Sequence, residues 1–184
     1  MSLAPRRWAA ELLHVWFHRL RPADWWGGSA RVDAMLERRF SAEWHALQTC
    51  PPDSFLADPR SALAAVLLFD QVPRNLFRDD PRAYATDPLA RVICHGALDR
   101  GYLHRLERRQ QAFLVMPLMH SEDIADQRLS LALFVRINGG ANLAFARSHH
   151  RMIARFGRFP HRNAVLGRTS SAAEKRAVAA GFAW

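Results

Sequence analysis

The side chains best suited to bind a charged ligand lie between His149 and Arg168, near the C-terminal end of the chain. This basic segment is rich in arginine, histidine and asparagine and contains no carboxylate. Guanidinium groups bind carboxylates and phosphates through paired, charge-assisted hydrogen bonds. After a turn at Gly157, Phe159-Pro160 opens a short helix whose free backbone N–H groups would also favour an anion. We therefore expect a small anionic ligand to be held by Arg155, Arg158, His161, Arg162, Asn163 and Arg168.

A second polar cluster, His120-Ser121-Glu122-Asp123, contains side chains of the kinds that transfer protons or bind metal ions. On a helix, Glu122 and Asp123 point about 100° apart, so both cannot easily serve one ion together with His120. The pattern is also typical of a helix N-terminus, with Ser121 as the N-cap and two acids in the first turn. We expect no metal here, and His120, Glu122 and Asp123 are candidates for proton transfer.

Asp70 begins a third polar cluster, which continues with Gln71, Arg74 and Asn75. At helical spacing its carboxylate shares a face with three apolar residues, Leu63, Val66 and Leu67. An acid on such a face needs a partner, because losing one costs roughly 3–5 kcal/mol. Two interpretations stay open. In one, Asp70 is neutralised in a structural clamp by a nearby arginine: Arg74, Arg155 or Arg162. In the other, Asp70 faces a ligand and is a catalytic candidate, with Arg74 and Asn75 among the ligand-binding residues.

Helices are expected to position these clusters, since apolar residues recur at helical spacing and strand-type alternation is nearly absent. Asp58 is expected to cap a helix that starts at Pro59, and the Val72-Pro73 step to end it. Asn138-Gly139-Gly140 is a stop signal for a later helix. The sequence predicts one all-α domain over residues 1–184, with about seven to nine helices. The expected helices cover residues 9–20, 29–48, 59–72, 86–100, 105–116, 121–138 and 141–156, with a short one after 171.

The composition is that of a globular protein, with 49% hydrophobic and 23% charged residues. No apolar run approaches the roughly 18 residues of a membrane span. The start of the chain is basic, but Glu11, His14 and His18 interrupt what would be the apolar core of a signal peptide. Cys50 and Cys94 lack the spacing of a CxxC or zinc motif. We expect a cytoplasmic protein, away from the membrane, without a metal or other cofactor.

The net charge of +9 raises the question of nucleic-acid binding. The excess is local, because residues 1–126 carry sixteen arginines and sixteen acids, whereas residues 127–173 carry eight arginines and no acid. On the helix expected at 141–156, His149 falls on the apolar side and the arginines fall on the opposite, solvated side. The chain has a single lysine, which indicates a general preference for arginine. We therefore consider a nucleic-acid partner unlikely.

Three blocks of the sequence carry a family resemblance: residues 70–75, residues 120–123 and residues 155–163. They resemble, in order, the signature blocks of the bacterial family called domain of unknown function 924. The segments at 15–17, 24–26 and 83–87 also match. The resemblance implies an all-α fold related to tetratricopeptide-like α-α superhelices and no established activity. Departures from the usual pattern occur at His18, Val72, Met119 and Arg151, and at the last two an acid is usual.

Two functional hypotheses of different classes follow. In the first, the three blocks meet in a site that binds a small anionic ligand, with an enzyme acting on an anionic metabolite as the alternative. In the second, the chain is a helical interaction module whose groove holds a peptide or a partner helix. A closed polar pocket would favour the first and an open apolar groove the second. The sequence leaves the oligomeric state open.

Overall fold

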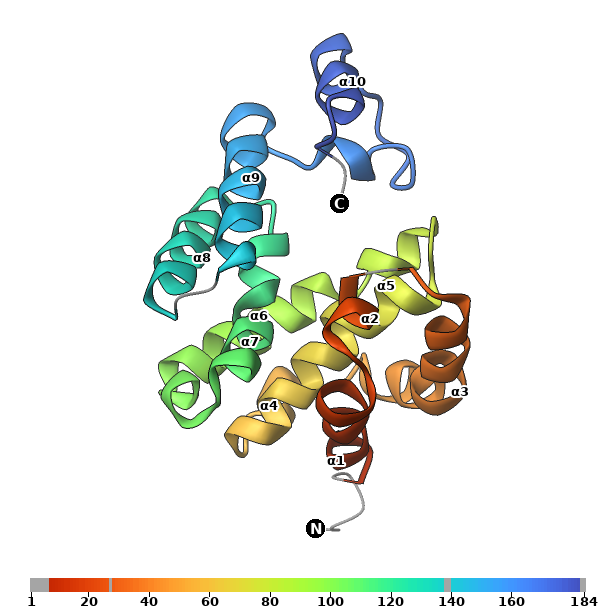
Figure 1. The fold of residues 1–184 in the computed structure, drawn as a ribbon, viewed down its shortest axis with the longest axis vertical. Helices are drawn as coiled ribbons and strands as arrows, with labels where there is room; N and C mark the ends of the chain where they lie inside the picture. Colours follow the sequence, from red (N-terminus) through yellow and green to blue (C-terminus); the bar gives the residue numbers. More distant parts are fainter. Residues whose placement is uncertain (1–6, 27, 138–139, 183–184) are drawn as a thin grey trace. The chain divides into compact units, whose positions relative to one another are not determined.

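The computed structural model describes residues 7–26, 28–137 and 140–182, and the elements assigned within them are all helical (Figure 1). The all-α prediction is confirmed. Eight of the α-helices described have eight residues or more, within the predicted seven to nine, and α2 and α5 are short. The chain divides into two compact units, Met1–Leu114 and Val115–Trp184. That it forms one domain with a tetratricopeptide-like superhelix stays a prediction. The basic start of the chain and Asn138-Gly139 lie outside the described residues.

In the first unit, α4 packs against α1 and α6, and α3 packs against α5. Tighter 3₁₀ turns and wider π turns join several of these helices. The stretch Pro22–Trp26, which lies outside the helices expected from the sequence, forms a short helix. The α-helices of this unit are α1 (Arg7–His14), α2 (Pro22–Trp26), α3 (Ala30–Leu47), α4 (Pro59–Val66), α5 (Val72–Leu76), α6 (Asp87–Asp99) and the first half of α7 (Arg108–His120).

The prediction that Val72-Pro73 ends a helix is wrong. The chain continues from α4 through a π-helical turn at Leu67–Gln71 into α5, where Pro73 occupies one of the first positions. In this wide turn the Val72 N–H reaches back five residues to the carbonyl of Leu67. Proline is tolerated at the start of a helix because the N–H it lacks would have no partner within that helix. Asp70 and Gln71 therefore stay on a continuous helical path and are buried.

The second unit begins within α7, and its next helix, α8 (Ile124–Arg136), starts later than the sequence indicated. Its N-cap is Asp123, not Ser121, since Asp123 accepts a hydrogen bond from the Ala125 N–H at 2.8 Å. The Ser121 hydroxyl instead accepts from the Asp123 N–H at 3.1 Å. Glu122 therefore lies outside the helix, where its carboxylate is available for contacts elsewhere in the unit.

The buried side chain of Gln127, on α8, closes the C-terminal end of α7. Its amide nitrogen donates to the carbonyls of Met119 at 2.8 Å and Ser121 at 2.7 Å, with a longer contact of 3.4 Å to Leu118. The last carbonyls of a helix have no partner within that helix. The Gln127 side chain of α8 thus supplies the hydrogen-bond donor that the last carbonyls of α7 need.

Helix α9 (Ala141–Phe156) has the predicted bounds and lies beside α8 (Figure 1). It ends at Gly157, whose φ of 69° lies in the left-handed region that glycine adopts without strain. Helix α10 (Ala172–Ala179) begins with a capping box, in which the Glu174 N–H donates to the Ser171 hydroxyl and the Ser171 N–H donates to the Glu174 carboxylate. A small apolar core of this unit contains Met152, Ile153, Phe159 and Ala177.

Within the described residues, no helix is both long enough and apolar enough to cross a lipid bilayer.

The capping of α4 gives a first prediction. The Asp58 carboxylate accepts from the backbone N–H groups of Arg60 and Ser61, each at 3.0 Å. Asp58→Ala should therefore lower the free energy of unfolding by about 1 kcal/mol, which lowers the melting temperature by roughly 2–4 °C in a chain of this length. Ser29→Ala is the matched control, because Ser29 occupies the N-cap of α3 without a side-chain capping bond. Thermal unfolding followed by circular dichroism measures both, and equal losses would contradict the assignment.

Candidate functional site

In the first unit, the Asp70 carboxylate is fully buried and is paired with Arg74. The Arg74 guanidinium lies 3.5 Å from that carboxylate, donates to the Asp70 carbonyl oxygen, and donates to Asp87 at 3.0 Å. Burial of Arg74 opposes its charge, but the charges of Asp87 and then Asp70 outweigh burial and raise the arginine pKa. The amide of Asn75 donates to the Gln71 carbonyl at 3.1 Å. These contacts hold the π turn against α6, the geometry expected of a structural clamp.

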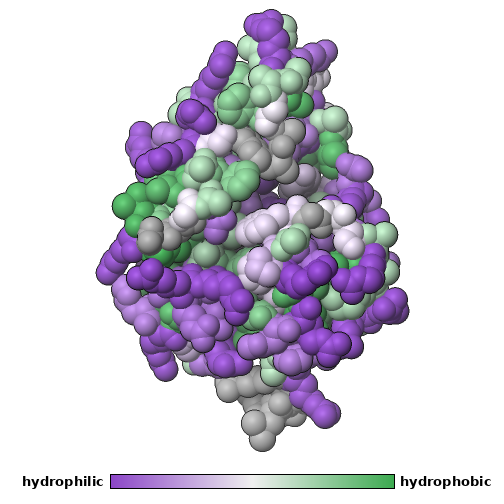
Figure 2. Space-filling view, in the orientation of Figure 1, coloured by the Kyte–Doolittle hydropathy of each residue, from purple (hydrophilic) through white to green (hydrophobic). Residues whose placement is uncertain are grey.

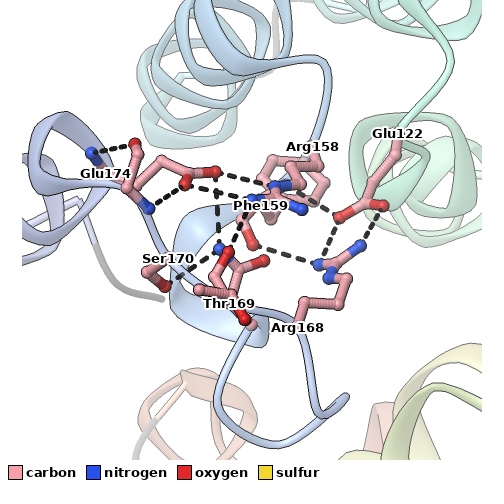
Figure 3. A network of polar contacts seen from close by, with 9 residues as sticks. Glu122, Arg158, Phe159, Arg168, Thr169, Ser170 and Glu174 are labelled. Atoms are coloured by element: carbon pink, nitrogen blue, oxygen red, sulfur yellow. Dashed lines mark hydrogen bonds and ion pairs between the residues drawn. The ribbon is translucent and has the colours of Figure 1, made fainter.

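In the second unit, Glu122 is the anchor of a polar network (Figure 3). Its carboxylate accepts two hydrogen bonds from the Arg168 guanidinium, at 2.7 and 2.9 Å, and one from the Phe159 N–H at 2.8 Å. Partial burial raises the pKa of Glu122, but these donors outweigh it and hold the pKa below its usual value. Glu122 is therefore ionised at neutral pH, and it ties two points of the basic segment to the start of α8.

A second ion pair joins the basic segment to α10. Arg158 donates to both carboxylate oxygens of Glu174, at 2.7 and 3.1 Å, and to the carbonyl of Thr169 at 2.9 Å (Figure 3). The bonds from Arg158 and from the Ser171 N–H lower the pKa of Glu174. The Asn163 amide donates to the Ser170 hydroxyl at 3.1 Å and approaches Glu174 at 3.4 Å. Arg158, Asn163 and Arg168, three predicted ligand-binding residues, thus make contacts that shape the segment itself.

Sequence reasoning did not identify Glu174 as a member of this network. The signal was present in the spacing Ser171-x-x-Glu174, which predicts a capping box. The capping box places the Glu174 carboxylate at the N-terminus of α10, and only the fold brings Arg158 to the same place. The sequence predicted Glu122 as a candidate for proton transfer and as a residue of the first turn of a helix, not as the partner of Arg168.

Three further polar side chains of this unit lie beside the buried ring of Phe159. The guanidinium carbon of Arg162 lies 4.5 Å from the centre of that ring, and the Arg162 side chain is itself buried. The imidazoles of His149 and His161 lie 5.2 and 5.6 Å from the Phe159 ring centre. His120 follows at 6.2 Å from His149. We call Phe159 with His120, His149, His161 and Arg162 the Phe159 cluster.

The electrostatic character of the Phe159 cluster is visible at His149. Burial and, after it, the positive charges of His120, Arg162 and His161 together lower the pKa of His149 to about 3. The His149 Nδ1 lies 2.8 Å from the Phe145 carbonyl, an acceptor, so Nδ1 carries the proton of the neutral ring. The lone pair of the ring is therefore on Nε2. This is a buried position of positive potential.

The structure brings the second and third sequence blocks together. His120 and Glu122 lie in the same unit as His161 and Arg162, and they contact partners within the basic segment or around it. Asp123 is an exposed N-cap, and Arg155 is exposed with its guanidinium 4.9 Å from the Phe156 ring centre. The first block belongs to the other unit, so that all three blocks meet stays a prediction. Among the residues described, no group of three His, Cys, Asp or Glu side chains is arranged to hold a metal ion.

Comparison with known families matches residues 12–181 to the model described as bacterial protein of unknown function (DUF924). The chain belongs to the DUF924 family. A solved structure, that of a protein of unknown function (ATU0120) from Agrobacterium tumefaciens, is similar to this DUF924 chain. The two have 36% sequence identity and a TM-score of 0.87, and the match covers 92% of this chain and 96% of the other. A search of curated proteins gave no match.

The Glu122 network of this DUF924 chain gives a second prediction. Both ion-pair partners are about a quarter exposed, so the pair lies between the surface range of 0–1 kcal/mol and the buried range of 3–5 kcal/mol. Glu122→Gln should cost about 1–3 kcal/mol and lower the melting temperature by roughly 3–10 °C. Glu37→Gln, the same change at an exposed site on α3, should leave the melting temperature nearly unchanged. A stable Glu122→Gln protein would show that the basic segment does not depend on this carboxylate.

His149 gives a third prediction, for the dependence of stability on pH. Its pKa is about 3 in the folded chain and 6.5 in its unperturbed state. Below pH 6.5 the unfolded chain therefore binds a proton that the folded chain excludes, and stability falls as the pH falls from about 6.5 towards 3. The slope from this one group approaches about 1.4 kcal/mol per pH unit. The charges facing His149 are those of His120, His161 and Arg162, and α8, which packs beside α9, buries the carboxylate of Asp126.

His149→Gln should flatten this part of the pH profile, measured by urea unfolding at a series of pH values. Met152→Leu, on the same buried face of α9, controls for a packing change without a titrating group. An unchanged slope in the His149 variant would assign the acid sensitivity to other groups.

Proposed function

We propose that this DUF924 protein binds a small anionic ligand at the Phe159 cluster. The observation that carries the proposal is the convergence of a buried guanidinium and two imidazoles on one aromatic ring in the second unit, with a third imidazole, that of His120, beside His149. Such a set offers planar, charge-assisted donors beside an apolar wall, which is the usual make-up of a site for a carboxylate or phosphate group.

The distribution of charge in the second unit supports an anion in preference to a cation. Residues 127–173 contain no acid. Two carboxylates that reach the basic segment, Glu122 and Glu174, accept bonds from Arg168 and Arg158. The lowered pKa of His149, caused first by burial and then by the positive charges of His120, Arg162 and His161, agrees with an anion as the ligand.

The same geometry favours binding over proton transfer. A general acid or base works best with a pKa near the working pH. His149, with a pKa of about 3, is a weak base at neutral pH, and Glu122 is an ionised carboxylate held by three donors. We place binding first and an enzyme acting on an anionic metabolite second.

We retain the cytoplasm as the proposed location. Both cysteines, Cys50 and Cys94, are free thiols, as is usual for proteins of a reducing compartment.

The test measures the melting temperature of the full chain with added phosphate, sulfate or citrate, against sodium chloride at equal ionic strength. A ligand present at a hundred times its dissociation constant stabilises the folded state by about 2.7 kcal/mol, which corresponds to a rise of roughly 5–10 °C. Arg162→Gln should abolish this rise. Arg155→Gln is the matched control, since it makes the same change on the exposed side of α9.

Because Arg162 is buried, its loss also affects folding, and His161→Gln provides a second variant at a half-buried position. It should fold and lose the anion-dependent rise. The proposal is overturned if none of the anions exceeds the chloride control, or if both cluster variants respond as the wild-type chain does.

A further inference from the structure

We infer that the anion bound by the Phe159 cluster also carries a hydroxyl group, which donates a hydrogen bond to two buried side chains of α8, Gln127 and Ser130. The inference rests on the proposed function and adds the chemical class of the ligand. That class is a small hydroxylated anion, either a hydroxycarboxylate or the phosphate ester of a polyol. The molecule as a whole is largely polar on the face drawn in Figure 2, so the inference concerns buried atoms and not a surface patch.

The Gln127 side chain is fully buried, and the fold uses its nitrogen. The Nε2 donates to the carbonyls of Met119 and Ser121, the two neighbours of His120 in the chain. The Oε1 is shielded from solvent and has no hydrogen-bond partner among the residues that the structure describes. Gln127 thus brings an unused acceptor against the segment whose imidazole, that of His120, belongs to the Phe159 cluster.

Ser130 shows the same feature one helical turn further along α8. It is fully buried, and its Oγ is also without a hydrogen-bond partner in the described part of the chain. Residues three apart on a helix lie on the same face, so the Gln127 and Ser130 side chains are neighbours. A buried polar atom without a partner costs its full desolvation free energy. Two such atoms on one face favour a group supplied from outside the fold.

The polar groups of α8 and of the Phe159 cluster differ in kind. The buried polar side chains of α8 are Asp126, Gln127 and Ser130, a carboxylate, an amide and a hydroxyl. Since the Gln127 N–H groups face the end of α7, this side of the helix presents acceptors and one hydroxyl. The Arg162 guanidinium beside the Phe159 ring has donors alone. An anionic group therefore suits Arg162, and a hydrogen-bond donor suits α8.

A hydroxyl fits the acceptors of α8 better than an ammonium group does, because an ammonium would approach the permanent positive charge of Arg162. An ordered water molecule is the other group that would donate to both atoms. Such a water would stabilise the fold whether or not a ligand is bound. Replacing Ser130 separates the two cases, since removal of a hydroxyl that binds only a ligand leaves the free protein as stable as before.

The test measures the melting temperature of the full chain at rising ligand concentrations, which yields a dissociation constant for each ligand. Malate is compared with succinate, and glycerol 3-phosphate with propyl phosphate, so the members of each pair differ only in hydroxyl groups. We expect the hydroxylated member of one pair to bind at least about tenfold more tightly. The pair that shows this preference identifies the anionic group. Aspartate, which has an ammonium in place of the malate hydroxyl, should bind no better than succinate.

Ser130→Ala should reduce the preference for the hydroxylated ligand to about threefold or less. Its melting temperature without ligand should equal that of the wild-type chain, because the described residues give the hydroxyl no partner. Ser41→Ala is the matched control, the same change on α3 of the first unit, and it should keep the preference.

The proposed function and this inference fail in different ways. If no ligand of either pair exceeds the chloride control, the anion site itself is refuted. If the anions bind but the members of each pair bind equally, or aspartate binds as malate does, the hydroxyl inference is overturned and the anion site stands. The inference is also overturned if Ser130→Ala keeps the preference, or if it lowers the melting temperature without ligand, the result expected for an ordered water.

Discussion

The second unit depends on the carboxylate of Glu122. Residues 157–171 contain no α-helix of their own, only one 3₁₀ turn at Pro160–Arg162. What fixes this stretch is a set of bonds from outside it: Glu122 holds the Phe159 N–H and the Arg168 guanidinium, and Glu174 holds Arg158. Ordering a segment without regular secondary structure costs conformational entropy, and these charge-assisted bonds offset it. Glu122 binds the backbone N–H of Phe159, and the ring of the same residue is the centre of the candidate site.

The carboxylates and the arginines of the second unit have different roles. Glu122 and Glu174 are used internally, each by one arginine of the basic segment. Arg162 is buried beside the Phe159 ring, whereas the arginines of α8 and α9 are exposed. The buried guanidinium is the one that the anion-binding proposal uses.

The sequence predicted local features well. The bounds of α9, the capping of α4 by Asp58 and the close relation of Asp70 to Arg74 all follow from residues within a few positions of one another. The errors have physical causes. The Val72-Pro73 step was expected to end a helix. Instead, a π turn changes the hydrogen-bond spacing and lets the helical path continue through the proline. Helix propensities of single residues do not predict such a turn. Ser121 and Asp123 are both good N-cap residues, and the sequence alone does not choose between them.

The candidate site was harder to predict because its pairs are distant in sequence. Glu122 and Arg168 are 46 positions apart, and Arg158 and Glu174 are 16 apart. From the sequence, Arg158, Arg162 and Arg168 were all expected to bind an anionic ligand. Only the fold separates them into two structural arginines and one that stacks on an aromatic ring.

The contact between Gln127 and the end of α7 makes the last turn of one helix depend on the next helix. The carbonyls of Met119 and Ser121 receive their donor from a side chain of α8. These hydrogen bonds at the end of α7 are therefore complete only when α8 is in place. A glutamate of the same size at this position would present two acceptors to a ring of acceptors. What position 127 requires is thus a donor, and this requirement comes from the neighbouring helix rather than from α8 itself.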